Sequence, residues 1–200
     1  MVKYGSNILL LIMIITIEMA VGQVSIGADV VSRYVWRGTD FGNAAAIQPT
    51  IETTLGSVTV GAWGSWALNG AADGNECDLY ASTQVGPANV ILTDYFFPAY
   101  TGVDSILTLD KHVIEGSAGI DIGPVSVLSA ANLSGDDDNS IYLELSFNAF
   151  TVGLGNGVYS TDGEFAPVSL GVTANRDNLS ASYIINPDQE TSFLVFGVSF

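Results

Sequence analysis

A strict alternation of apolar and polar residues runs through Ile141-Tyr142-Leu143-Glu144-Leu145-Ser146-Phe147-Asn148. Successive side chains of a β-strand point to opposite faces, so a strand here has one apolar face and one polar face, with Glu144 on the polar one. The wall of a membrane β-barrel requires this pattern, because one face meets lipid and the other meets a wet lumen. This stretch therefore predicts a barrel strand.

The same alternation recurs along most of the chain. Val24, Ile26, Ala28 and Val30 alternate with Ser25, Gly27 and Asp29, and residues 47–52 repeat the pattern. Because no twelve-residue segment shows a helical stripe, the fold class is all-β: an antiparallel transmembrane up-and-down β-barrel of about twelve strands, with ten strands as the alternative. The strands are expected near 24–37, 45–55, 57–67, 76–85, 88–97, 112–122, 124–133, 140–148, 150–159, 165–174, 178–185 and 191–200.

Short and long connections alternate between these strands. Tight turns are expected at 55–57, 86–88, 123–124, 148–149 and 175–178, and mostly longer polar loops at 39–44, 68–75, 98–111, 134–139 and 160–164. Outer-membrane barrels combine short periplasmic turns with longer outer loops. A soluble exported β-sandwich remains the rival architecture.

The two ends of the chain indicate export and insertion. Lys3 precedes an apolar run at 8–17, and Ala20-Val21-Gly22 forms a small-x-small cleavage signature. We therefore expect a signal peptide at 1–22 and one barrel domain at 23–200. Leu194, Phe196, Val198 and Phe200 alternate up to the last residue, which resembles the insertion signal that the barrel assembly machinery reads.

Composition limits the function classes. Only 13% of residues are charged and the formal net charge is −16, which argues against nucleic-acid binding because that needs a basic surface. Asp136, Asp137 and Asp138 belong to acidic outer loops, which either are solvated, hold divalent cations shared with lipopolysaccharide, or bias the mouth toward cations. The single cysteine, Cys77, is expected to pack on a strand face.

Several motifs are similar to those of a known family. They are Ser32-Arg33-Tyr34-Val35-Trp36-Arg37-Gly38, Gln48-Pro49, Gly61-Ala62-Trp63-Gly64-Ser65, Glu76-x-Asp78-x-Tyr80 and Tyr95-Phe96-Phe97-Pro98. Together they resemble the opening of the TorF-type porins, bacterial outer-membrane β-barrels, over most of the chain after residue 22. The resemblance implies a porin-like barrel, from which the Asp-rich loops and the scarcity of Lys and Arg depart.

Charge parity predicts which residues line the lumen. Asp29, Arg33 and Arg37 lie four apart on one face of the first expected strand, and a charge facing hydrocarbon is costly. We expect Arg33 to lie opposite Pro49 and to pair with Glu52. The predicted pore-lining set is Asp29, Arg33, Arg37, Gln48, Glu52, Asp78, Tyr80, Glu115 and Glu144, acting either as a solute filter or as an ion-pair network that stiffens the wall.

The same alternation assigns several aromatic residues and one acid to the lumenal or the lipid-facing side of the wall. Tyr34 and Trp36, on the opposite face, suit an interfacial aromatic girdle. If Tyr80 faces the lumen then so does Tyr95, which leaves Asp94 facing lipid unless a bulge redirects it. Inward side chains such as Trp63 and Tyr142 could close the lumen.

The predicted function is an outer-membrane porin-like channel for passive diffusion of small polar solutes or ions. The alternative is a structural or adhesive barrel without an open pore. Catalysis is not expected: His112 is the only histidine, and neither a Gly-x-Ser-x-Gly elbow nor a metal-spaced His pair occurs. No cofactor or metal is expected. The predicted partners are outer-membrane lipid, lipopolysaccharide, the barrel assembly machinery and small polar solutes, at the bacterial outer membrane.

Overall fold

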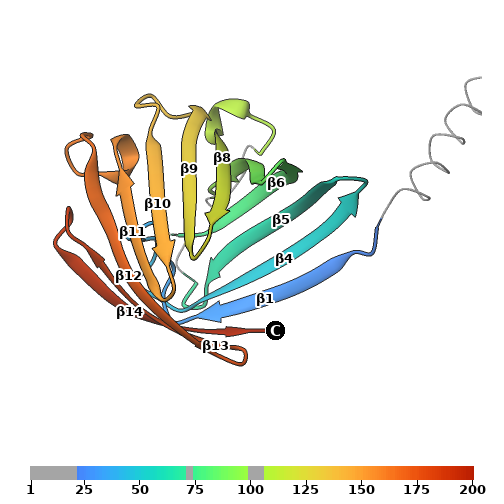
Figure 1. The fold of residues 1–200 in the computed structure, drawn as a ribbon. Coiled ribbons are helices and arrows are strands. Elements are labelled where there is room, and N and C mark those ends of the chain that lie inside the picture. Colours follow the sequence, from blue (N-terminus) through green and yellow to red (C-terminus); the bar gives the residue numbers. More distant parts are fainter. Residues whose placement is uncertain (1–21, 71–73, 99–105) are drawn as a thin grey trace, which may run out of the picture.

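A computed structural model describes residues 22–70, 74–98 and 106–200, and the predicted signal peptide lies outside these residues apart from Gly22. Twelve antiparallel strands form a closed barrel (Figure 1), which confirms the predicted fold class and the larger strand number. The wall strands are β1 (Ser25–Val31), β4 (Ala46–Leu55), β5 (Val58–Ala67), β6 (Glu76–Val85), β7 (Ala88–Phe96), β8 (His112–Ile122), β9 (Val125–Ser134), β10 (Ile141–Phe147), β11 (Phe150–Gly155), β12 (Ala166–Arg176), β13 (Leu179–Asn186) and β14 (Thr191–Ser199).

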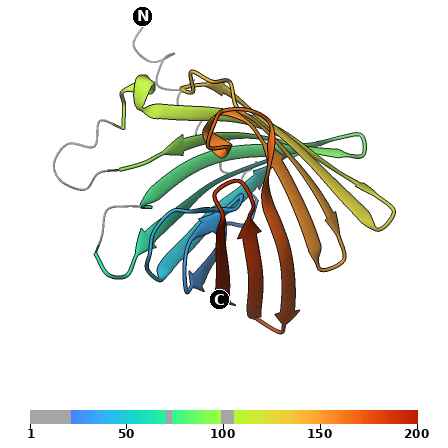
Figure 2. The same cartoon turned by 90° about the vertical axis from the view of Figure 1, so that its left-hand side faces the viewer.

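Every wall strand pairs with its neighbours in the chain, and β14 closes the barrel against β1 (Figure 2). At the seam, the Phe200 amide donates to the Ala28 carbonyl at 2.9 Å. Helix in the described residues is limited to two three-residue 3-10 turns, η1 (Leu109–Lys111) and η2 (Gly157–Tyr159). Within the described ranges, no helix is both long and apolar enough to cross a bilayer.

The connections at the two ends of the barrel differ in length, as the sequence predicted. At one end of the barrel, where β1 begins and β14 ends, the strands are joined by two-residue turns. These are Gly56–Ser57, Gly86–Pro87, Gly123–Pro124, Asn148–Ala149 and Asp177–Asn178. We call this the turn end. The opposite end, called the loop end, carries the longer connections, which include residues 135–140 and 156–165.

The two faces of the wall differ in polarity. The outer face carries exposed apolar side chains on nearly every strand, among them Ile26, Ile51, Leu79, Leu92, Leu143, Leu145, Phe150, Leu170, Leu194 and Phe196. The inner face carries buried polar groups, including Gln48, Glu76, Asp78 and Glu115. Because cross-strand partners share a face, the pairing of Asp29 with Gln48 and of Asp78 with Trp63 puts these four residues on the inner face.

The first wall strand is shorter than expected. It was predicted to span 24–37 but ends at Val31. At Ser32 the backbone amide still donates to the Phe196 carbonyl at 2.8 Å, but the side-chain hydroxyl accepts the 2.9 Å hydrogen bond from the Phe196 amide. The chain then turns at Arg37 and Gly38, whose φ angles are +50° and +83°. Residues 32–45 fold back and include β2 (Val35–Trp36) and β3 (Thr39–Asp40), which pair with each other. We call residues 32–45 the inner hairpin.

Candidate functional site

The inner hairpin lies inside the barrel, because its side chains contact strands from around the wall. Tyr34 packs against Trp63 of β5, and Trp36 against Tyr95 of β7. The Gly38 carbonyl accepts a hydrogen bond from Asn186 of β13. A segment that contacts such distant strands together can only occupy the lumen. The hairpin is therefore the central element of the candidate site.

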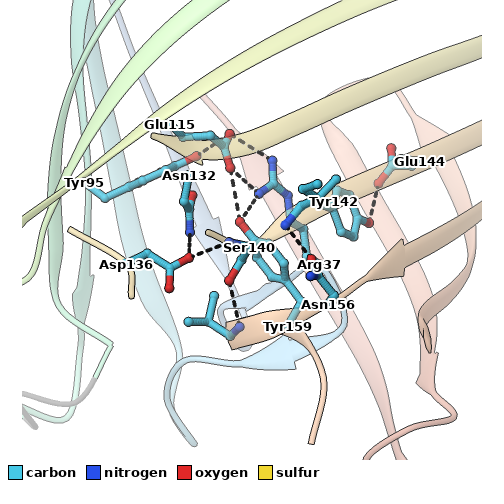
Figure 3. A network of polar contacts seen from close by, with 12 residues as sticks. Arg37, Tyr95, Glu115, Asn132, Asp136, Ser140, Tyr142, Glu144, Asn156 and Tyr159 are labelled. Carbon is cyan, nitrogen blue, oxygen red and sulfur yellow. Dashed lines mark hydrogen bonds and ion pairs between the residues drawn. The ribbon is translucent and has the colours of Figure 1, made fainter. Parts of the chain in front are cut away.

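Arg37 is the principal anchor of the hairpin (Figure 3). Its guanidinium donates two hydrogen bonds to the Glu115 carboxylate of β8, at 2.5 and 3.0 Å, and one to the Tyr159 hydroxyl at 2.6 Å. It also lies over the rings of Trp36 and Tyr142, 4.2 and 4.4 Å from their centroids. The side chains of Arg37 and Glu115 are only 7% and 2% exposed. A charge pair this deeply buried persists only when further hydrogen-bond partners satisfy both ions.

Tyrosine hydroxyls supply these further partners. Tyr95 and Tyr159 each donate to Glu115 at 3.1 Å, and Tyr142 donates to Glu144 at 2.8 Å. Burial raises the pKa of Tyr159 to about 12, against the opposing effect of Arg37, so this phenol stays protonated and able to donate. The result is a lumenal network in which one arginine and several tyrosines share the carboxylates of the wall.

Arg33 occupies a second and more open position. It donates to Asp40 at 2.6 Å and to Asn43, both within the inner hairpin, and lies 5.5 Å from the Phe193 ring centroid. The expected pairing with Glu52 is therefore wrong, and so is its place opposite Pro49, which Ala28 occupies. Glu52 instead accepts a 2.8 Å hydrogen bond from Tyr80. The cause is the early end of β1, which removes Arg33 from the wall.

Tyr34 and Trp36 also leave the positions that the sequence suggested. Tyr34 is buried and donates to Glu76 at 2.8 Å, while Trp36 contacts Phe41, Tyr95 and Tyr159. They pack inside the barrel, so the prediction of an interfacial aromatic girdle at these two residues is wrong. Alternation alone could not reveal this, because the apolar and polar residues keep alternating in the segment that folds back into the lumen.

The remaining predicted site residues fall on one face. Asp29, Gln48, Glu52, Asp78, Tyr80, Glu115 and Glu144 all lie on wall strands, on the face that bears the buried polar groups. Leu194 and Phe196 are 59% and 56% exposed on the outer face, which Val198 and Phe200 share. Glu76, Asp40 and Tyr159 belong to the site but were not among the predicted residues. Parity with Asp78 could have found Glu76, whereas Tyr159 lies in a loop without periodicity.

Three cavities lie on the inside of the barrel, and two of them share lining residues. One of about 480 Å³ at the loop end is lined by Trp36, Phe41, Tyr95, Tyr159 and residues 135–138. A second of about 390 Å³ also touches Trp36 and Tyr95, together with Asp78. A third of about 260 Å³ lies toward the turn end, beside Gln84, Asp121 and Glu144. Trp36 and Tyr95 line the first two cavities, so their contact lies at the boundary between them.

The acidic loop at the mouth of the first cavity is internally bonded. Asp136 accepts hydrogen bonds from Asn132, Ser140 and the Asp138 amide at 2.8–3.0 Å (Figure 3 shows the first two). Burial alone would raise the pKa of Asp136, but the bonds from Ser140 and Asn132 hold this pKa below its ordinary value. Asp137 and Asp138 are exposed. One carboxylate thus shapes the loop and two face solvent.

Asp94 faces outward, as the parity argument required, and it has a partner. His112 Nδ1 lies 2.7 Å from the Asp94 carboxylate, and its Nε2 lies 2.8 Å from the Ile106 carbonyl. Phe96 stacks on the imidazole. Because both partners are acceptors, the ring satisfies them together only as an imidazolium. The second nitrogen therefore contacts a backbone carbonyl rather than the serine that a catalytic triad would need.

Comparison with known proteins gives a family. A family model described as "Bacterial protein of unknown function (Gcw_chp)" matches residues 19–186. No curated protein and no solved structure matches the chain. The matched range contains the inner hairpin, Glu76, Asp78, Glu115 and Tyr159. The chain belongs to the Gcw_chp family of bacterial proteins.

Proposed function

We propose that this protein is a porin-like channel of the bacterial outer membrane, through which small polar solutes and cations diffuse passively. The observation that carries the proposal is the contrast between the two faces of one closed wall: an apolar outer face and an inner face bearing carboxylates, hydroxyls and cavities. A contiguous exposed apolar surface of this kind is unfavourable in water but suits lipid.

The charges on the inner face favour cations. The lumen contains two arginines, Arg33 and Arg37, and each already pairs with a carboxylate. Among the described residues, none of the inward carboxylates of Asp29, Glu52, Glu76, Asp78 and Glu144 forms an ion pair. An excess of fixed negative charge between low-dielectric walls concentrates cations and repels anions.

The layout of the connections supports an orientation in the membrane. Short turns are typical of the periplasmic end of an outer-membrane barrel and longer loops of the outer end. The loop end, with Asp136, Asp137 and Asp138, would then face the medium and the lipopolysaccharide. Leu194, Phe196, Val198 and Phe200 would be read by the assembly machinery. A porin-like barrel is also what the resemblance of the Ser32–Gly38 motif to TorF-type porins implies.

The decisive experiment is conductance of the refolded protein in planar bilayers. We expect discrete current steps, and in a KCl gradient a reversal potential of the sign that reports cation selectivity. A second candidate, a structural barrel without an open pore, is favoured by one observation, the inner hairpin within the lumen. Replacing residues 33–43 with a short glycine-serine linker separates the two. If neither the native protein nor this variant conducts, the channel proposal is wrong.

A further inference from the structure

The Asp78 side chain has an unsatisfied buried atom. The residue is 5% exposed, and its Oδ1 has no hydrogen-bond partner among the described residues. Glu76, two residues earlier on the same face of β6, is 2% exposed and accepts a hydrogen bond from Tyr34. The Glu76 and Asp78 side chains also hydrogen-bond to each other, so Asp78 Oδ1 is the atom left without a partner in the described part of the chain. Two neighbouring carboxylates without a basic partner are costly to bury, and such an unsatisfied group calls for an explanation.

The cavity of about 390 Å³ beside Asp78 has aromatic walls. Tyr34 and Trp36 reach it from the inner hairpin, Trp63 from β5 and Tyr95 from β7. Arg33 also lines it, but the charge of that guanidinium is matched by Asp40. The cavity volume lies in the range that holds small molecules.

A carboxylate among aromatic rings has a specific preference among cations. The faces of Trp and Tyr rings attract organic cations, and the Asp78 carboxylate at the cavity wall favours a cation that carries N–H donors. A calcium ion would need six or more oxygen ligands, and the described residues contain no cluster of three or more His, Cys, Asp or Glu able to hold a metal ion. An alkylammonium ion satisfies the carboxylate and the rings together.

We propose that this cavity is a binding site for a small primary alkylammonium ion, with its ammonium group on Asp78 and its alkyl chain against the aromatic rings. The proposal rests on the proposed channel function only in that a permeable lumen gives the ligand its route to the cavity. The inner hairpin supplies part of the wall, so its inward fold creates the site.

Binding is measured with the full mature protein refolded in detergent, by tryptophan fluorescence and by calorimetry, at constant ionic strength. Butylammonium chloride is the probe, with tetramethylammonium and sodium chloride as comparisons. We expect saturable binding of butylammonium, and about tenfold weaker binding of tetramethylammonium because it cannot donate a hydrogen bond. An equal response to sodium would overturn the proposal.

Three variants test the carboxylates. Asp78→Asn should weaken butylammonium binding by about tenfold or more, since it removes a charge-assisted hydrogen bond. Glu76→Gln, which keeps an acceptor for Tyr34, should weaken it less. Asp177→Asn is the matched control: this exposed turn residue at the turn end has a φ of +54° that asparagine tolerates, and binding should not change. Unchanged affinity in Asp78→Asn with native gel mobility would refute the site.

Channel recordings separate this inference from the function on which it rests. If both hold, butylammonium reduces the potassium current of the native protein and does so far less in Asp78→Asn. Saturable binding that depends on Asp78, in a protein without conductance, would refute the channel proposal and support the binding site. Conductance that butylammonium does not affect, together with no saturable binding, would sink the site and leave the channel.

Discussion

The barrel wall and the inner hairpin are built on different physical principles. The wall is a continuous ladder of backbone hydrogen bonds, and its side chains need only to alternate in polarity. The strands of the hairpin are two residues long, and specific side chains hold the segment: Arg37 on Glu115, Tyr34 on Glu76, and Asn186 on the Gly38 carbonyl. We therefore expect that a single substitution can release the hairpin from the lumen while the barrel wall keeps its fold.

The largest effect is expected from Phe200→Ser, which changes assembly of the wall rather than its stability. The Phe200 side chain is 78% exposed on the outer face, while its backbone still pairs with Ala28. If the C-terminal pattern is an insertion signal, the level in the outer-membrane fraction should fall severalfold while export across the inner membrane continues. Phe147→Ser, an outward aromatic change away from the C-terminus, is the control. If the outer-membrane levels of both variants fall equally, the effect of Phe200 is that of any lipid-facing aromatic residue and the C-terminal pattern is not an insertion signal.

This contrast also explains what the sequence could predict. Period-two alternation, turn residues and connection lengths predicted the wall, because each of these is local information. Where β1 ends, the Ser32 hydroxyl bonds to a residue 164 positions away, and Arg37 at the hairpin turn bonds to Glu115, 78 positions away. Arg33 and Arg37 keep the parity of Asp29, so no local pattern distinguishes a continuing strand from one that folds inward. The charged residues were found, but their partners were not.

The second prediction detaches the hairpin by removing its buried cation. Arg37→Ala leaves Glu115 buried without its counterion, a loss of the kind that costs about 3–5 kcal/mol. We expect a lower melting temperature in detergent, a higher single-channel conductance and an unchanged β signal in circular dichroism. Arg176→Ala is the control, because that side chain is 90% exposed and its ion pair with Asp177 is long, at 4.0 Å. Loss of the β signal in Arg37→Ala would mean that the wall depends on the hairpin.

The third prediction tests whether the hairpin needs its tight turn. A Cβ at Gly38, where φ is +83°, would collide with the Val168 carbonyl oxygen, whereas Gly163 has a φ of +78° and open space around it. Both substitutions to alanine carry the strain of a positive φ, about 1–2 kcal/mol. Gly38→Ala should also displace the hairpin, so it should lose more stability and gain conductance. If the two variants melt alike and conduct alike, the hairpin does not depend on this close contact.

The smallest effect on stability is expected at the second arginine of the same hairpin. Arg33 pairs with Asp40, but these side chains are 31% and 23% exposed, so solvent screens the pair and its loss should cost no more than about 1 kcal/mol. The ion selectivity of the channel should respond more clearly, because Arg33 lines the cavity beside Asp78. Arg33→Ala should shift the reversal potential further toward cation selectivity, and Asp40→Asn should shift it the other way. Lys111→Ala, which removes a positive charge beyond the wall strands, should do neither.

Cysteine substitution of Arg33 in a Cys77→Ser background gives an independent check, since a membrane-impermeant thiol reagent should modify the new thiol from water. Labelling by lipid-soluble reagents alone, or a melting temperature that falls as far as in Arg37→Ala, would show that both arginines brace the hairpin and that neither acts on the permeating ion.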